Sequence, residues 1–327
     1  MECAILWCNL GTPDEPTPAA VRRYLAEFLS DPRVVEIPRA VWQPLLRGVI
    51  LPLRAPKSAA KYAKIWGPDG SPLKTWTEKQ SKLLQGWLGE RGHRVKVRYA
   101  MRYGSPSIAS QLDALKSEGV KRVLVMQAYP QYSCSTTASV IDEVGRWARL
   151  QRAVPELRFV NDFHDDTGYV EALVKRVERS WREGRPDHLV MSFHGVPERT
   201  VRLGDPYQAH CLETARRLAG RLGLEARDFT VSFQSRFGRA KWLQPATDAV
   251  LAHYPREGVK RVAIATPGFS ADCIETLEEL GIRGRETFRH AGGEQFALLE
   301  CLNDSPEGMD MLTRLVAREL AGWREQS

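Results

Sequence analysis

Short apolar segments alternate with longer segments of helical periodicity along almost the whole chain. Seven runs rich in Val, Ile, Leu or Phe are typical of buried strands, and they cover residues 4–10, 94–101, 123–127, 158–160, 188–193, 230–234 and 262–265. Apolar residues recur with a period of about 3.6 in the segments 18–29, 78–90, 107–117, 136–150, 169–182, 207–222 and 308–323. Because consecutive parallel strands need a crossover that is usually a helix, the alternation predicts an α/β fold with doubly wound parallel sheets.

Two stretches, each near the end of one half of the chain, share a local pattern. GVKRVLVMQAYPQYS (119–133) and GVKRVAIATPGFSAD (258–272) both place Gly-Val-Lys-Arg before an apolar strand and polar residues after it. We therefore expect two doubly wound domains of similar plan, the N-terminal one over 1–155 and the C-terminal one over 156–304. Residues 305–327 are expected to form a helix that packs back on the core.

The formal net charge of +7 suits an anionic partner, yet the basic residues do not form one long run. They occur in short pairs such as Lys121 with Arg122, and no zinc-finger or RNA-motif spacing accompanies them. The chain has no GxxxxGK[ST] phosphate loop, and no GxGxxG follows a strand. The sequence therefore argues against both nucleic acid and nucleotides as ligands.

The cysteines and the N-terminus indicate the cellular compartment in which the protein works. Six cysteines without a CxxC pair do not make a disulfide framework in a chain of 327 residues, which favours a reducing compartment. MECAILWCNLG has the pattern of a first strand rather than of a signal peptide. No uncharged apolar run approaches the length of a membrane span. A cytoplasmic protein is expected.

Residues 40–53, AVWQPLLRGVILPL, are unusually apolar and aromatic for a surface segment. One interpretation is an amphipathic helix that packs its apolar side on the core. The other is a lip that touches a membrane or an apolar substrate. The sequence by itself leaves both interpretations open.

His194 ends an expected central strand in LVMSFHGVP (189–197). Open α/β sheets keep their ligand sites at the carboxyl ends of the strands. A lone histidine at this edge is either a packing residue, or a base or metal ligand that titrates near neutral pH.

The segment ADCIETLEEL (271–280) places Glu275 and Glu279 four residues apart on one helical face. Asp272 fits an N-cap, and Glu275 would then complete a capping box. The alternative is a site for a divalent metal or for protons, because a like-charge pair at this spacing is otherwise unfavourable. If this turn and His194 share one sheet edge, the donor set suits Fe(II) or Zn(II) and proton abstraction.

Nine separate segments, in matching order, resemble the ferrochelatase family, whose members insert Fe(II) into a porphyrin. They are NLGTP (9–13), SPLKTWT.KQ (71–80), MRYGSP (101–106), YPQYSCSTT (129–137), SFHGVP (192–197), GDPY (204–207), FQSRFG..KWLQP (233–245), PGFSADCIETLEEL (267–280) and HAGGE (290–294). The resemblance is to bacterial members without an iron–sulfur cluster. It implies the chelatase fold, in which two Rossmann-like domains with parallel sheets enclose a porphyrin cleft.

The resemblance also implies a reaction. Fe(II) would replace two protons of a dicarboxylic porphyrin, protoporphyrin IX, to give protohaem in the last step of haem biosynthesis. His194 and Glu275 match the family's catalytic histidine and acid, and both are expected to bind the incoming metal. Asp272 and Glu279 are expected to relay protons or metal. The alternatives are a chelatase for another tetrapyrrole such as coproporphyrin III, and a porphyrin or haem carrier without turnover, which has little need for an acidic relay.

The porphyrin itself is expected to contact eight residues: Leu10, Tyr62, Trp242 and Phe269 at the ring, and Arg54, Ser71, Arg102 and the adjacent Tyr103 near the propionates. A leucine cannot coordinate metal, so no metal ligand is expected at Leu10. Residues 40–53 would form the upper lip of the cleft, where a lipophilic porphyrin could arrive from the inner face of a membrane.

Iron is expected as a substrate, and no permanently bound cofactor is expected. Some relatives hold a [2Fe–2S] cluster mostly through cysteines near the C-terminus. Here the last cysteine is Cys301, and four suitably placed cysteines are absent, so no cluster is predicted. Cys273 stands where some members have histidine, and it is either a soft metal ligand or a buried thiol. Without the C-terminal extension through which such relatives dimerise, a monomer is expected.

Overall fold

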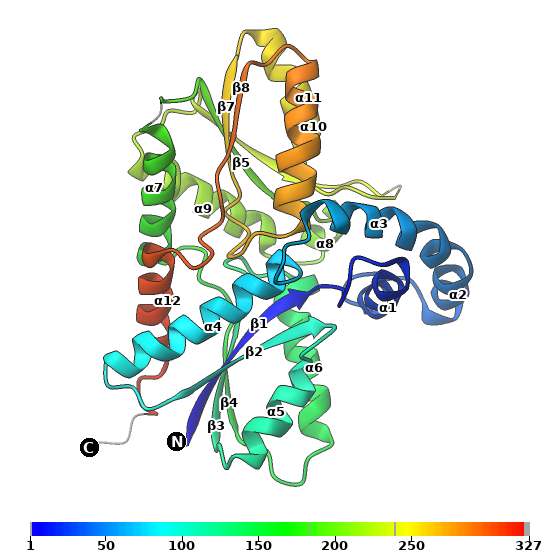
Figure 1. Ribbon diagram of the computed structural model, residues 1–327, viewed down its shortest axis with the longest axis vertical. Helices are drawn as coiled ribbons and strands as arrows, with labels where there is room; N and C mark the ends of the chain where they lie inside the picture. Colours follow the sequence, from blue (N-terminus) through cyan, green and yellow to red (C-terminus); the bar gives the residue numbers. More distant parts are fainter. Residues whose placement is uncertain (1, 183, 239, 324–327) are drawn as a thin grey trace. The chain divides into compact units, whose positions relative to one another are not determined.

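The computed structural model describes residues 2–182, 184–238 and 240–323 (Figure 1). The chain divides into two compact units. Of the described residues, unit 1 holds 2–128, 133–162 and 312–323, and unit 2 holds 129–132 and 163–311. The two units are described separately.

Unit 1 is built on a parallel sheet with the strand order β2-β1-β3-β4. The strands are β1 (Cys3–Gly11), β2 (Lys96–Tyr103), β3 (Arg122–Gln127) and β4 (Glu156–Val160). β1 is central, because Cys8 pairs with Ala100 of β2 and with Gln127 of β3. A central parallel strand is buried on both faces, which explains why β1 is a continuous apolar run rather than an alternating one.

Helices cover both faces of this sheet, because successive side chains of a strand point to opposite faces. Leu6 and Cys8 pack in a core that α5 and α6 close on one face. On the other face the Trp7 indole donates a hydrogen bond to Gln80 of α4 at 3.1 Å. The helices of unit 1 before α12 are α1 (Pro18–Phe28), α2 (Arg39–Leu45), the π-helix η1 (Leu46–Ile50), α3 (Leu51–Ile65), α4 (Pro72–Glu90), α5 (Ile108–Ser117), the π-turn η2 (Cys134–Ala138) and α6 (Ser139–Arg149).

Unit 2 is built on a second parallel sheet with the order β6-β5-β7-β8. The strands are β5 (His188–His194), β6 (Phe229–Gln234), β7 (Arg261–Ala265) and β8 (Gln295–Leu298). The sequence did not predict β8. It is four residues long and alternates between exposed and half-buried, so it lacks the apolar run that marks the other strands.

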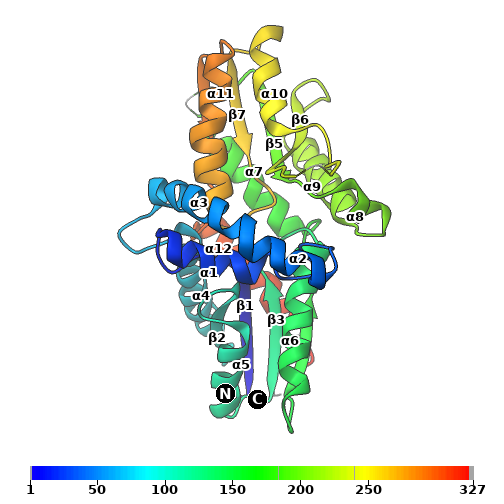
Figure 2. The same ribbon diagram turned by 90° about the vertical axis from the view of Figure 1, so that its right-hand side faces the viewer.

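The core of unit 2 also involves helices on both sides of its sheet. β5 and β7 share a buried cluster with α10, η4 and α11, while α7 and α9 pack against each other on the opposite side (Figures 1 and 2). The helices of unit 2 are α7 (Thr167–Trp181), α8 (Glu198–Arg202), α9 (Tyr207–Arg221), α10 (Thr247–His253), the 3₁₀ turn η3 (Tyr254–Glu257), the π-helix η4 (Glu275–Gly284) and α11 (Arg285–His290).

The two sheets have the same plan. In each, the first strand in sequence is flanked by the second and third, and the fourth lies outside the third. The two GVKRV segments precede β3 and β7, which are the third strands of their sheets. The predicted repetition of a doubly wound parallel fold is therefore confirmed.

The apolar segment at 40–53 falls in α2, η1 and the start of α3, which packs on α1 (Figure 2). One side of this helical stretch is buried, as a core helix requires; Leu46, Leu51 and Ala55 lie on it. The other side is apolar and exposed, and it carries Val41, Leu45, Val49 and Leu53, spaced by four residues; the exposed Ile37 lies four residues before Val41, just ahead of α2. We call these five residues the lip face. The core-helix interpretation explains only the buried side.

The last described helix, α12 (Pro306–Glu319), begins in unit 2 and continues into unit 1 from Leu312 onward. Its buried side includes Met309, Leu312 and Val316. Within the residues that the structure describes, no helix combines the length and the hydropathy needed to cross a membrane.

Candidate active site

His194 is the last residue of β5, the central strand of unit 2. Its Nδ1 lies 2.6 Å from the carbonyl oxygen of Gly195. A carbonyl oxygen only accepts hydrogen bonds, so Nδ1 carries the proton and the lone pair of the neutral ring is on Nε2. The Tyr207 hydroxyl donates to the His194 carbonyl at 2.9 Å and so holds the backbone. The half-buried imidazole is thus fixed in the tautomer that offers Nε2 to a metal or a proton.

Gly195 allows the end of β5 to lie very close to β6. Its N–H donates to the Gln234 carbonyl at 2.7 Å, and a Cβ at this position would lie 2.7 Å from the same oxygen. The same Cβ would lie 3.2 Å from Cε3 of Trp242. The predicted ring contact Trp242 is therefore packed directly beside the residue that follows His194, with Phe237 at 5.1 Å between ring centroids.

Buried polar side chains connect this strand end to the acidic helix. The Ser192 hydroxyl donates to Oε1 of Gln234 at 2.7 Å, and Nε2 of Gln234 donates to the Glu275 carbonyl at 2.8 Å. Gln234 is also the residue of β6 that pairs with His194. The backbone at Glu275 therefore lies near the strand end that carries His194.

Glu275 and Glu279 lie on η4, which is wound as a π-helix. Both are half-buried. The Glu279 carboxylate accepts hydrogen bonds from the backbone N–H of Ser235 at 2.9 Å and from its hydroxyl at 2.6 Å. The neighbouring Glu278 is buried and paired with Nε of Arg283 at 3.0 Å. π-Helical segments are often found at functional sites, and here the segment presents carboxylates at the edge that carries His194.

Asp272 is buried just before this helix, and the capping-box prediction is wrong. Its Oδ1 accepts a hydrogen bond from the Thr276 hydroxyl at 2.8 Å, and its Oδ2 accepts one from Nδ2 of Asn303 at 2.7 Å. η4 has no side-chain cap. The Asp272 carboxylate accepts hydrogen bonds from two side chains, one of which lies 31 residues away in the sequence. It therefore does not cap the backbone of the helix.

Cys273 has the environment of a buried thiol. Its side chain is almost fully buried, and this burial, reinforced by the negative charge of Glu275, raises the pKa of the thiol well above its ordinary value. The thiolate is the form that binds metals, so burial opposes the metal-ligand interpretation.

In unit 1 the predicted porphyrin residues of this group come from β1, α3 and the start of α4. Leu10 is half-buried and is the next-to-last residue of β1. Ser71 is buried at the start of α4 and accepts a hydrogen bond from the Thr12 hydroxyl at 2.7 Å. Arg54 and Tyr62 lie on α3; burial lowers the pKa of Arg54, and Tyr62 is buried edge-on to Trp66.

Arg102 and Tyr103 belong to a buried network around Asp31. The Arg102 guanidinium donates to Oδ2 of Asp31 at 2.7 Å, and the Tyr103 hydroxyl donates to the same oxygen at 2.7 Å. Nε of Arg102 also donates to the Ser139 hydroxyl at 2.7 Å. Tyr103 is fully buried. Much of the hydrogen-bonding capacity of Arg102 is thus used within unit 1, which the sequence did not reveal because Asp31 lies 71 residues away.

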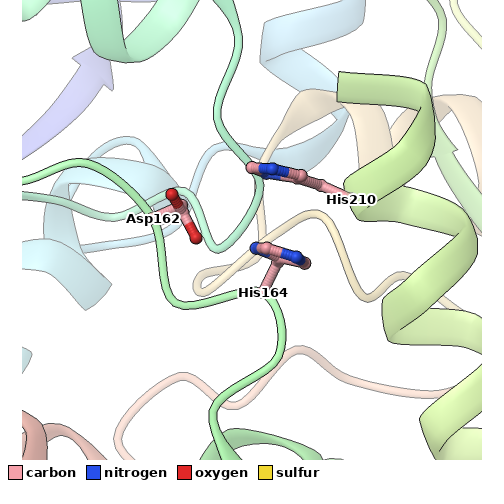
Figure 3. Close-up of side chains that lie close together, drawn as sticks. All are labelled: Asp162, His164 and His210. Atoms are coloured by element: carbon pink, nitrogen blue, oxygen red, sulfur yellow. The ribbon is translucent and has the colours of Figure 1, made fainter. Parts of the chain in front are cut away.

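A histidine pair that the sequence analysis did not single out lies elsewhere in unit 2. The rings of His164 and His210 stack at 3.6 Å between centroids with 7° between their planes, and Asp162, two residues before His164, brings a carboxylate near them (Figure 3). The Tyr132 N–H donates to Nδ1 of His210 at 3.3 Å. One possible ligand atom from each of the three residues lies within 4.8 Å of the other two, so the group could hold a metal ion.

Comparisons with known proteins agree with the motifs in the sequence. A family model described as Ferrochelatase matches residues 2–320. The ferrochelatase of Methylibium petroleiphilum is 60% identical over 326 residues, which are 99% of this chain and 90% of that protein. The ferrochelatase of Bordetella pertussis is 51% identical over 320 residues, covering 98% of this chain and 88% of that protein.

Solved structures share the fold at low sequence identity. SirB from Bacillus subtilis, solved with Fe³⁺, superposes with a TM-score of 0.58 at 13% identity and covers 100% of this chain and 98% of that one. CbiX, described as the terminal enzyme for the biosynthesis of sirohaem in denitrifying bacteria, gives a TM-score of 0.53 at 14% identity, with 97% and 100% covered. The predicted chelatase fold is therefore confirmed.

Proposed function

Because this chain belongs to the ferrochelatase family and is thus a metal-inserting enzyme, we propose that it inserts Fe(II) into protoporphyrin IX. The products would be protohaem and two protons, one from each pyrrole N–H that the metal replaces. The observation that carries the proposal is the 2.6 Å contact between Nδ1 of His194 and the Gly195 carbonyl oxygen. This contact leaves the lone pair of the neutral ring on Nε2, at the strand end near the backbone of Glu275.

The chemistry requires a site that takes up protons while a cation arrives. His194 Nε2 would bind the incoming Fe(II) or accept a pyrrole proton, and the Glu275 carboxylate would serve the other of these two needs. Both roles suit half-buried groups that reach the substrate without losing contact with polar neighbours. Fe(II) enters this reaction as a substrate.

Glu279 and Asp272 would carry protons or metal between the reacting centre and solvent. Glu279 follows Glu275 along η4. Asp272 also borders a cavity of about 300 Å³ behind η4, whose lining includes Arg285 and Glu300. Through this cavity, Asp272 would exchange protons or metal with solvent without passing the porphyrin side of the site.

For the porphyrin, we propose ring contacts from Leu10, Tyr62, Trp242 and Phe269. Trp242 has the most direct support, since it packs beside the residue that follows His194. For the propionates we propose Arg54 and Ser71, with a smaller contribution from Arg102, whose guanidinium already serves Asp31 and Ser139. Tyr103 would act only by holding Asp31 in that network.

We propose that the lip face contacts a lipid bilayer, from which the apolar porphyrin reaches the site. Five exposed apolar side chains follow one another at a spacing of four residues, and the exposed Arg39 and Arg47 lie in the same segment. Such a series with basic neighbours suits an interface with anionic headgroups. This contact requires no spanning helix.

Flotation with vesicles of phosphatidylcholine and phosphatidylglycerol tests this contact. Wild type should float with the vesicles, and the double variant Val41→Ser/Leu53→Ser should lose most of that binding. Leu150→Ser is the matched control, since Leu150 is an equally exposed leucine elsewhere in unit 1. Equal flotation of wild type and the double variant would remove the lip face from the proposal.

We also propose that the enzyme is a monomer in the cytoplasm without a resident cofactor or iron–sulfur cluster. Light scattering should then give a mass near 36.9 kDa. Purified protein should contain no stoichiometric iron or acid-labile sulfide. A mass near twice this value, or sulfide in proportion to protein, would contradict these two points.

The main test is anaerobic metallation of protoporphyrin IX by Fe(II), followed by the loss of porphyrin fluorescence, with coproporphyrin III in parallel. Wild type should turn over protoporphyrin IX faster than coproporphyrin III. Glu275→Gln should lose about 100-fold in kcat, as expected for a group that handles protons. Glu286→Gln, an exposed acid on α11, is the matched control. Tight binding of porphyrin without metallation would favour a carrier, and faster turnover of coproporphyrin III would change the substrate.

A further inference from the structure

Two residues other than glycine have positive φ in the described parts of the chain, Ser235 (φ 68°) and Asn303 (φ 47°). Both lie in unit 2. The left-handed region is unfavourable for L-residues with a side chain, and such residues gather at functional sites. Here each of the two contacts one of the two acids proposed as the relay.

Ser235 is the residue directly after β6. In this left-handed backbone conformation, Ser235 binds both oxygens of the Glu279 carboxylate. Its N–H donates to one oxygen at 2.9 Å, and its hydroxyl donates to the other at 2.6 Å. The preceding residue, Gln234, stays in the strand and binds the Glu275 carbonyl. Two consecutive residues therefore hold η4 at two points, and the second point is the carboxylate itself.

Asn303 holds Asp272 by hydrogen bonds, as Ser235 holds Glu279. Its Oδ1 accepts from the Asp272 N–H at 2.9 Å, and its Nδ2 donates to Oδ2 of the same residue at 2.7 Å. The backbone N–H of Asn303 donates to the Ser270 carbonyl at 3.1 Å, which joins its segment to the loop before η4. The Asp272 side chain and backbone are both fixed by one residue that comes after β8.

Glycine would adopt either backbone conformation without strain, but it would provide no side-chain donor. We infer that Ser235 and Asn303 are positioning residues, whose strained backbones place hydrogen-bond donors on the carboxylates of Glu279 and Asp272. The inference rests on the proposed function, because it requires that these carboxylates take part in metal insertion. If these two residues only closed loops, glycine at either position would do so at least as well.

The variants Ser235→Gly and Asn303→Gly separate these roles, because glycine relieves the strain and removes the donor. Removal of a hydrogen bond to a charged group is expected to lower kcat/KM for Fe(II) about tenfold in each variant. The melting temperature should stay within a few degrees of that of wild type, because relief of the left-handed backbone offsets part of the lost hydrogen bonds. KM for protoporphyrin should not change. Ser180→Ala, which removes a half-buried hydroxyl that donates to the Val177 carbonyl on α7, is the control and should match wild type.

A double-mutant cycle completes the test. If Ser235 acts through Glu279, the variant Ser235→Gly/Glu279→Gln should be no slower than Glu279→Gln alone. Additive losses would overturn the inference, and so would full activity of both glycine variants or a parallel fall in activity and melting temperature. Failure of wild type to metallate porphyrin would instead overturn the proposed function.

Discussion

The two units have one strand order but different chemistry at the same edge. In both units, a glycine at the end of the first strand, or directly after it, allows that strand to approach the second strand closely. A Cβ on Gly11 would lie 1.8 Å from the carbonyl oxygen of Tyr103. A Cβ on Gly195 would lie 2.7 Å from the carbonyl oxygen of Gln234. Beside these glycines stand Leu10 in unit 1 and His194 in unit 2. The scaffold is repeated, whereas the imidazole and the carboxylates occur in one copy, so the reaction is a property of the site rather than of the fold.

The buried acids of the two units differ in the same way. Asp31 in unit 1 is buried: its Oδ2 accepts hydrogen bonds from an arginine, a tyrosine and a serine, and its Oδ1 accepts one from the Arg33 N–H. Glu275 and Glu279 in unit 2 are half-buried at a sheet edge. The Asp31 carboxylate is buried within the fold, whereas the Glu279 carboxylate, although bound by Ser235, stays partly exposed at that edge.

The largest difference in activity between the two units is expected when the residues beside the two glycines, Leu10 and His194, are replaced. His194→Ala should lower kcat for metallation about 1000-fold, the range for loss of a group that transfers protons. Leu10→Ala should lower it no more than about tenfold and mainly raise KM for porphyrin, because leucine offers only apolar contact. His253→Ala, at an exposed histidine of α10, serves as the control for His194→Ala. Equal losses at residues 10 and 194 would mean that both units share the chemistry.

The glycines themselves should matter for stability. Gly11→Ala is expected to cost at least about 3 kcal/mol in the free energy of unfolding, because φ is 114° and the new Cβ meets backbone. Gly70→Ala, with φ 102° and open space around it, should cost only about 1 kcal/mol. Urea titration measures both. A similar loss at the two positions would show that φ rather than the close approach of the strands decides the cost.

Asp31→Asn should cost about 2 kcal/mol near pH 7, since it breaks a buried ion pair with Arg102. Burial acts to raise the pKa of Asp31, but hydrogen bonds from Ser139, the Arg33 backbone and Tyr103, with the charge of Arg102, together lower it below 3.8. A lowered pKa in the folded state stabilises the fold above the ordinary value, and this gain disappears as the pH falls through the lower value.

The difference in stability between wild type and Asp31→Asn should therefore be constant from pH 5 to 7 and shrink below pH 4. Thermal unfolding across this range measures it. Asp142→Asn, at a half-exposed acid paired with Arg33, is the control and should change stability by less than about 0.5 kcal/mol. A difference that stays constant down to pH 2 would contradict the lowered pKa.

The smallest effect is expected on the surface of unit 2. Hydrogen bonds from Arg216 and Arg217 lower the pKa of Glu213 to about 2. Arg216 is well exposed and Arg217 is partly exposed, so solvent screens the pairs, and Glu213→Gln should cost less than about 0.5 kcal/mol. A loss above 1 kcal/mol in urea titration would show that the pair matters more than an ordinary surface pair.

Much of the fold could be predicted because buried parallel strands leave a pattern in the sequence. Seven strands and their crossovers follow from apolar runs and helical periodicity, whereas β8 is too short and too exposed to leave one. His194 could be placed because a strand end has a fixed location in such sheets.

The rest of the site depends on contacts between distant segments. Asn303 binds Asp272 from 31 residues away, which is why a capping box looked sufficient in the sequence. The positive φ of Ser235 has no signal in a serine. Which of the predicted porphyrin residues contact the ligand stays a prediction.

The π-winding of η4 has a consequence for which genetic changes the chain can tolerate. Each π-turn holds more residues than an α-turn, so loss of a single residue would allow the segment to rewind as an α-helix. A deletion of one residue would thus be absorbed within η4, and the residues after it would keep their orientation. Phe288 of α11, which is completely buried, would keep its place in the core. Deletion of one in-frame codon between Glu275 and Gly284 should therefore damage the fold less than deletion of one codon in α9, where everything after the loss would rotate by about 100°, and a deletion scan of the two helices would measure the difference.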